Sequence, residues 1–225
     1  MKTFFTFTKN VVIGLMLTLV VATVVSAQDK CHLLMVSGHA RSEVSVATKT
    51  IMEEVKNAFP EAELLYLDQT YPDFKIDIRK ERQRVLSADI IVLQYPIQWY
   101  TPPAIMKRWL EEVFTFGFAH DAEGGKLNGR TLILSMTSGA PESQYHIGER
   151  MNYPMEIYQL PLQQLAELCG MNFGGMVYTG GYNIMRKVID RDIHVQQAKD
   201  HAKTLIAKIK GVMASFQSNT KRTNP

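Results

Sequence analysis

The sequence of 225 residues carries 25 Lys and Arg against 22 Asp and Glu, and 46% of its residues are hydrophobic. The near-balance of charge gives no electrostatic case for binding nucleic acid, and two cysteines are too few for a disulfide framework. This composition is typical of one domain that can bury its own core, and we assign no metal site.

An export signal is the first feature along the chain. Lys2 and Lys9 precede an apolar run over residues 11–25, and the segment ends in Val25-Ser26-Ala27. The run is about fifteen residues long, whereas a helix that spans a bilayer needs roughly twenty. We therefore expect residues 1–27 to be a cleaved signal peptide, with an uncleaved anchor as the alternative. Loss of the two lysines lowers the formal charge from +3 to +1.

Apolar runs alternate with amphipathic stretches over residues 28–217, the pattern of a parallel sheet with helices on both faces. The apolar runs predict strands at 32–37, 63–67, 89–95, 131–136 and 172–178. The stretches with helical periodicity predict helices at 44–59, 77–88, 103–116, 154–168 and 190–216. Residues 218–225 are expected to be a frayed tail. The order predicts a doubly wound, flavodoxin-like α/β fold with five parallel strands in the order 2-1-3-4-5.

Three loops follow the first, third and fourth predicted strands, whose carboxyl ends should meet over one crevice. The first loop, 37–45, leads into the amino end of a helix, where unpaired amides and the helix dipole favour a phosphate. The side chains that could complete this phosphate site are His39, Arg41, Ser42 and Ser45. Alternatively, the serines only cap the helix and His39 only packs in the turn.

The other two loops offer a place for a flat ring. The loop 94–103 brings Trp99 and Tyr100 to the end of a central strand, although such a pair could equally belong to the core or to a dimer contact. The loop 136–146 has small residues that let backbone amides approach a ligand, with Tyr145 and His146 at its lip, or it is a flexible surface loop. Together the three loops predict a site for a phosphate joined to a planar heterocycle.

Several short runs carry a resemblance to a known family. They are Tyr71-Pro72-Asp73-Phe74, Gln94-x-Pro96-x-Gln98-Trp99-Tyr100, Gly117-Phe118-Ala119-His120 and Thr137-Ser138-Gly139. The chain resembles the flavodoxin-like NAD(P)H:quinone oxidoreductases from its first strand to its last helix. Within that family it is most similar to the ancillary oxidoreductases of glutathione-gated potassium efflux systems.

The resemblance implies FMN as the cofactor, with FAD less favoured, and it implies which residues bind it. His39 and the run Ser45, Val46, Ala47 and Thr48 would hold the phosphate and the ribityl chain. Pro96 and the following Ile97, Gln98, Trp99 and Tyr100 would border the isoalloxazine. Thr137, Ser138, Gly139 and Ala140 would present amides to its pyrimidine edge.

The family mechanism passes hydride from NAD(P)H to flavin N5 and then, after exchange in the same slot, to a quinone or similar small acceptor. Tyr145 and His146 would be the nearest proton donors, and the resemblance implies a homodimer. Two other functions stay open: a flavin-binding regulatory subunit of a membrane transporter, and a one-electron flavodoxin-type carrier, although such carriers are usually strongly acidic.

Export conflicts with the expected electron donor. The signal places the domain in the periplasm or on the outer face of the membrane, where reduced nicotinamide cofactors are not expected. Either the segment is not used, or stays as an anchor, or the domain takes electrons from a membrane partner or another donor. The domain would be cytoplasmic if the signal is not used.

Overall fold

A computed structural model of the protein describes residues 31–122, 125–182 and 191–223. The predicted signal peptide, 1–27, lies outside the described residues. Within the described part, no helix combines the length and the apolar character needed to cross a membrane.

Five parallel strands form one sheet, as the apolar runs predicted. They are β1 (Leu33–Ser37), β2 (Glu63–Tyr66), β3 (Ile90–Pro96), β4 (Thr131–Thr137) and β5 (Asn172–Thr179). Their order is β2-β1-β3-β4-β5, and every neighbouring pair is parallel. The flavodoxin-like strand order expected from the sequence is confirmed.

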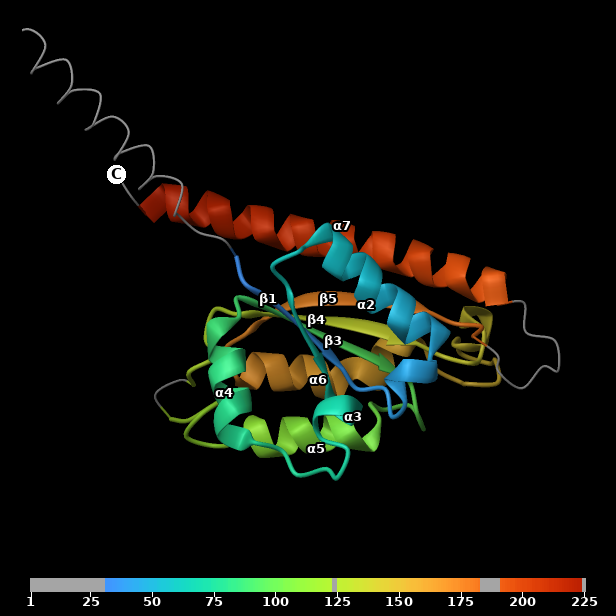
Figure 1. Ribbon diagram of the computed structural model, residues 1–225, viewed down its shortest axis with the longest axis horizontal. Helices are drawn as coiled ribbons and strands as arrows, with labels where there is room; N and C mark the ends of the chain where they lie inside the picture. The colour runs from blue at the N-terminus through green and yellow to red at the C-terminus, as the bar shows by residue number, and fades with distance from the viewer. Residues whose placement is uncertain (1–30, 123–124, 183–190, 224–225) are drawn as a thin grey trace, which may run out of the picture. The chain divides into compact units, whose positions relative to one another are not determined.

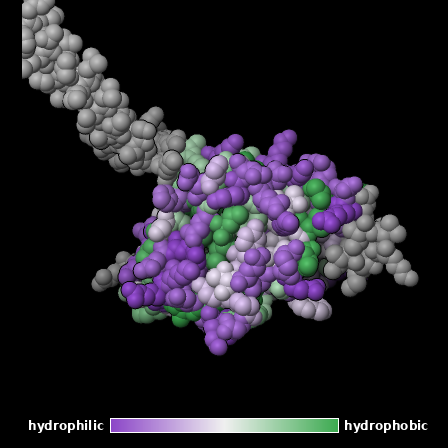
Figure 2. Space-filling view, viewed as in Figure 1, coloured by the Kyte–Doolittle hydropathy of each residue, from purple (hydrophilic) through white to green (hydrophobic). Residues whose placement is uncertain are grey.

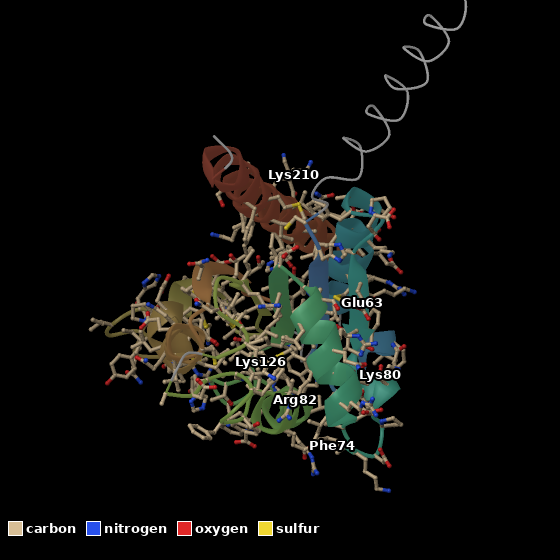
Figure 3. The ribbon with its side chains drawn as sticks, turned by 90° about the vertical axis from the view of Figure 1, so that its left-hand side faces the viewer. Glu63, Phe74, Lys80, Arg82, Lys126 and Lys210 are labelled. Atoms are coloured by element: carbon tan, nitrogen blue, oxygen red, sulfur yellow. The ribbon has the colours of Figure 1, made fainter. Side chains whose placement is uncertain are left out.

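Helices cover both faces of the sheet (Figure 1). One face carries α2 (Val46–Ala58) and α7 (Arg191–Thr223), which pack on each other. The other face carries α3 (Leu67–Thr70), α4 (Ile78–Ser87), α5 (Ala104–Val113) and α6 (Met155–Leu168). Figure 3 shows the two sides in side view, with Lys210 of α7 above the sheet and Lys80 and Arg82 of α4 below it.

Each face of the sheet has its own apolar core, because side chains alternate along every strand. In β1, Leu34 and Val36 join the core under α4, α5 and α6, whereas Leu33 and Met35 join the core under α2 and α7. The visible outer surface is largely hydrophilic, including the band over α7 (Figure 2). Burial on both faces explains why the strands read as continuous apolar runs.

Some local structure differs from the sequence prediction. The short helix α3 and two 3-10 turns, η1 (Ser42–Val44) and η2 (Glu142–Gln144), were not predicted. The last helix continues to Thr223, past the end at residue 216 that the helical periodicity predicted. No glycine or proline interrupts the chain between residues 212 and 224, which leaves the helix without a breaker there.

Candidate functional site

The three predicted loops leave the same edge of the sheet and are tied to one another. In the first loop, the Gly38 amide donates to the carbonyl of Gln94 (2.9 Å). In the second, the Ile97 amide donates to the carbonyl of Thr137 (2.7 Å), at the start of the third loop. The structure therefore brings together segments that lie about a hundred residues apart in the chain, as the predicted strand order requires.

The first loop ends in a helix start with unused donors. Ser45 is the N-cap of α2, and its hydroxyl oxygen accepts the Thr48 amide (3.2 Å). In the described part of the chain, the amides of Val46 and Ala47 in the first turn have no protein acceptor. The hydroxyl of Thr48 is buried and also has no partner there. Two backbone donors and one hydroxyl at the positive end of a helix form a site suited to an anion.

His39 and Arg41 lie beside this helix start. The His39 ring accepts the Arg41 amide at Nδ1 (3.0 Å), and the Arg41 side chain is exposed. Burial lowers the pKa of His39, and the nearby carboxylates of Asp68 and Glu43 partly oppose that shift. With Nδ1 engaged as an acceptor, the ring is neutral and keeps Nε2 as its proton-bearing nitrogen.

Ser42 was predicted to contribute to the phosphate site, and in the structure its hydroxyl is bonded to side chains of α3. Its side chain is buried, its hydroxyl donates to Asp68 (2.8 Å), and its amide donates to the same carboxylate (2.6 Å). Gln69 donates to the Ser42 hydroxyl oxygen (2.8 Å). These bonds fasten the loop to α3, a helix that the sequence analysis missed.

The second loop is a tight two-residue turn held in a strained conformation. The amide of Gln98 donates to the carbonyl of Thr101 (2.9 Å), and the reverse bond measures 3.0 Å. Between them, Trp99 and Tyr100 both have positive φ angles, 48° and 68°. This is the pattern of a type I′ turn, which normally carries Asn-Gly. Strain of this kind is concentrated at functional sites.

The same turn separates its two aromatic rings. Trp99 is 92% exposed, so the alternative that it belongs to the core is wrong. Tyr100 stacks on Tyr158 of α6, with ring centroids 4.7 Å apart. The loop therefore presents one fixed ring and one ring that is free to contact a ligand or another protein.

The third loop has its backbone pinned at two points. The carbonyl of Ser138 accepts the Tyr182 amide (3.0 Å), and the carbonyl of Ala140 accepts the Gly181 amide (2.9 Å). Among the described residues, the amides of Gly139 and Ala140 have no acceptor. The loop is therefore an anchored segment with two free donors, and not a loose surface loop.

Tyr145 is not at the lip of the third loop, contrary to the prediction. The turn η2 directs it inward, where it is 5% exposed and its ring contacts Tyr158 and Tyr178 edge-on, at 6.1 and 5.6 Å. Burial is the main cause that raises the pKa of Tyr178, and the Tyr178 hydroxyl lies 2.6 Å from the Ser138 hydroxyl. His146 is exposed, as predicted for a residue at the lip.

A pocket of about 350 Å³ opens between the first two loops and α3. Ala40 of the first loop and Gln98 of the second line it, together with Tyr71 and Phe74. Phe74 has a φ of 61°, and Figure 3 shows it at the lower edge of the molecule in that view. Tyr71 and Phe74 belong to one of the runs that carry the family resemblance, but nothing in their local pattern predicts that they lie beside the first loop.

The sequence did not predict that two polar side chains next to the site are buried. Gln94 in β3 is fully buried, and neither atom of its amide has a partner in the described structure. His201 in α7 is 2% exposed. The sequence holds two signals for them. One is a single amide in an otherwise apolar strand, and the other is a single imidazole on an apolar helix stripe.

Comparison with known families bears out the flavodoxin-like fold. Residues 31–206 match the family model described as having a flavodoxin-like fold. The chain belongs to this flavodoxin-like family. A curated relative of this flavodoxin-like protein is the glutathione-regulated potassium-efflux system ancillary protein KefF of Enterobacter sp. (strain 638). It is 35% identical over 141 residues, which are 63% of this chain and 78% of the relative.

Two solved structures have the same fold. One is the general stress protein 14 of Treponema denticola in complex with FMN, with a TM-score of 0.69 and 24% identity, covering 80% of this chain and 99% of that one. The other is an NADPH-quinone reductase from P. pentosaceus, with a TM-score of 0.64 and 18% identity, covering 78% of this chain and 97% of that one. At these identities the two structures support the fold.

Proposed function

We propose that this protein is an FMN-dependent oxidoreductase that uses NAD(P)H to reduce quinone-type acceptors. The observation that carries the proposal is the pair of donor groups at one edge of the sheet. Free amides of Val46 and Ala47 mark one end, and free amides of Gly139 and Ala140 mark the other. The relatives point the same way, because one solved structure holds FMN and another is named as a quinone reductase.

The residues present fit FMN. The first turn of α2 and the buried, unpartnered Thr48 hydroxyl would bind the phosphate and the neighbouring ribityl hydroxyls. The amides of Gly139 and Ala140 would bind the pyrimidine edge of the ring. The run from Pro96 to Tyr100, with its exposed Trp99, would border the ring system. One phosphate site and one ring site account for these donors. The donors therefore give no reason to favour the larger cofactor FAD over FMN.

Bound FMN would supply two-electron hydride chemistry between the donor and the acceptor. The chain itself would orient the ring and stabilise charge. The amides of Gly139 and Ala140 would stabilise negative charge that develops at the pyrimidine edge. The Tyr178 hydroxyl, in contact with Ser138, would link the buried Tyr145 to this loop and hold a proton there. Trp99 would form an aromatic wall for a planar acceptor.

The test is the visible spectrum of the purified protein. We expect flavin absorption bands after reconstitution with FMN, bleaching on addition of NADH or NADPH, and return of the bands when a quinone is added. A protein that stays colourless and does not quench FMN fluorescence would overturn the proposal. If the bands bleach only with dithionite, the protein binds flavin, but the proposal that NAD(P)H is the donor is wrong.

The KefF relative favours a second candidate function, that of an ancillary subunit of a membrane transporter. In that case flavin binding would persist while turnover would be dispensable. Deletion of the gene, complemented by a variant that binds FMN without turning over, separates the two functions. Restored ion efflux would favour the ancillary role, and unrestored quinone resistance would favour the enzyme.

We further propose a homodimer with the second loop near the contact, and export of the domain, in which case a membrane partner or another donor would supply the electrons in place of NAD(P)H. The predicted signal peptide supports export. The 92% exposure of Trp99 leaves that side chain available to a second copy of the chain. Fractionation of cells with determination of the mature amino terminus tests export. Light scattering of wild-type protein and a Trp99→Ala variant tests the dimer, for which we expect a lower mass in the variant.

A further inference from the structure

A row of polar side chains crosses the α2 and α7 face of the sheet close to the candidate site. Ser37, Gln94 and Ser135 lie side by side on β1, β3 and β4, and all three are fully buried. This row stands out because the residues two positions earlier in the same three strands, Met35, Val92 and Ile133, are apolar. Buried polar groups of this kind need hydrogen-bond partners.

His201 of α7 is the partner of one member of this row, Ser135, and it also bonds to the next strand. Its Nε2 lies 2.9 Å from the Ser135 hydroxyl of β4, and its Nδ1 lies 2.9 Å from the Thr179 hydroxyl of β5. One imidazole therefore bridges two neighbouring strands from above. Burial lowers the pKa of His201 to about 4, so the ring is neutral near pH 7, with one nitrogen donating and the other accepting.

The bridge lies where the third loop begins. Thr179 pairs with Thr137, the last residue of β4, and its carbonyl accepts the amide of Ser138, the next residue. Beyond Ser138 come Gly139 and Ala140, whose amides are free in the described structure. The position of these two donors therefore depends on the relative position of the carboxyl ends of β4 and β5.

Helix packing alone does not require a histidine here. The neighbours of His201 on the buried stripe of α7 are Ala198, Ala202, Leu205 and Ile209, which are apolar and buried. An imidazole among them loses its contact with water, and only its two hydroxyl partners offset that loss. These two hydrogen bonds hold the ends of β4 and β5 in fixed positions. Apolar packing is not directional, so it would not fix them in the same way.

We propose that His201 is a positioning residue that holds the third loop in the geometry needed to bind the ring of the flavin. The inference rests on the proposed function and deepens it, because it assigns a role in cofactor binding to α7, a helix outside the three loops. His201 acts through Ser135 and Thr179 and does not touch the cofactor itself.

The test compares FMN with riboflavin, which has the same ring and lacks the phosphate. In His201→Leu we expect the dissociation constants of both flavins to rise by the same factor, at least fivefold, and the absorption band of the bound flavin to shift. Both constants are measured by quenching of flavin fluorescence at a temperature where circular dichroism shows the variant folded. Leu205→Ala is the matched control, since it weakens the packing of α7 and leaves both hydroxyl bonds in place.

The control should lower the melting temperature and change each dissociation constant by less than twofold. Equal weakening in Leu205→Ala would overturn the proposal, as would riboflavin binding within twofold of wild type in His201→Leu. If His201→Leu does not fold, the double variant Ser135→Ala with Thr179→Val removes the same bonds from the strands and must give the same common factor. Wild-type protein that binds neither flavin would instead contradict the proposed function.

Discussion

The amino end of α2 and the loop after β4 lie at the same edge of the sheet, but they hold their free amides in different ways. At α2 the amides of Val46 and Ala47 are free because every α-helix leaves its first amides unpaired. At the third loop, Gly139 and Ala140 expose their amides only because neighbouring carbonyls are pinned to residues 181 and 182. One end is a product of regular local structure, and the other depends on distant contacts.

Because of this difference, we expect the two ends of the site to respond to different substitutions. The helix start should tolerate changes elsewhere in the protein, and it should respond only to changes in its own first turn. The third loop should respond to changes in β5 and α7, which hold it in place.

The largest expected effect is on stability in acid. Because burial lowers the pKa of His201 to about 4, the folded protein keeps this ring neutral while the unfolded chain takes up a proton below about pH 6.5. The free energy of unfolding should therefore fall as the pH drops from about 6.5 to about 4, by about 3 kcal/mol from this group. Urea unfolding at pH 7 and pH 4.5 measures the loss, and it should be clearly smaller in His201→Leu. Equal losses in both proteins would contradict the assignment.

Gly180→Ala should damage the third loop most directly. A Cβ at this position would lie 2.5 Å from the carbonyl oxygen of Ala140 and 2.7 Å from the amide nitrogen of Glu142, so the loop must move. We expect a loss of roughly 1–3 kcal/mol in stability, as for other overpacked sites, and at least tenfold weaker binding of both FMN and riboflavin.

Gly211→Ala is the control for this substitution. An added Cβ there meets nothing within 4 Å, and Gly211 lies within α7. The variant should gain roughly 0.5–1 kcal/mol from helix propensity and bind both flavins as wild type does. Tight riboflavin binding by Gly180→Ala would show that the third loop does not hold the ring.

Val46→Pro tests the helix start alone. Proline suits the first position of a helix, and Ser45 before it already has extended backbone angles, φ −82° and ψ 111°. The variant removes one free amide and keeps the helix. We expect about tenfold weaker FMN binding, because one hydrogen bond to a charged group is lost. Riboflavin binding should be unchanged. A parallel loss of riboflavin binding would place the phosphate elsewhere.

The smallest effect should come from the strained turn of the second loop. Trp99 is almost fully exposed and has a left-handed backbone, which Asn adopts more readily. Trp99→Asn should therefore raise the free energy of unfolding by about 0.5–1 kcal/mol and raise the KM for a planar quinone. Thermal unfolding and steady-state kinetics check the two parts, and a destabilised variant would show that the exposed ring packs on a partner.

Much of the fold could be predicted from the sequence because it depends on local periodicity. Apolar runs predicted all five strands, their alternation with helices predicted the strand order, and helical spacing placed the start of α2 within two residues of Val46. The common edge of the three loops then followed from the strand order alone. The part of the site that is regular structure was accessible in this way.

Contacts between distant segments decided the rest. The bonds from Ser42 to Asp68 and from Ser135 to His201 join residues 26 and 66 positions apart, and no local pattern encodes such a pairing. Trp99 and Tyr100 have poor propensity for the turn that they form, so flanking hydrogen bonds must impose it. The sequence by itself determined the sheet and the helix start, whereas tertiary packing decided which side chains face the site, because burial and hydrogen bonding outweigh the weaker preferences of single residues.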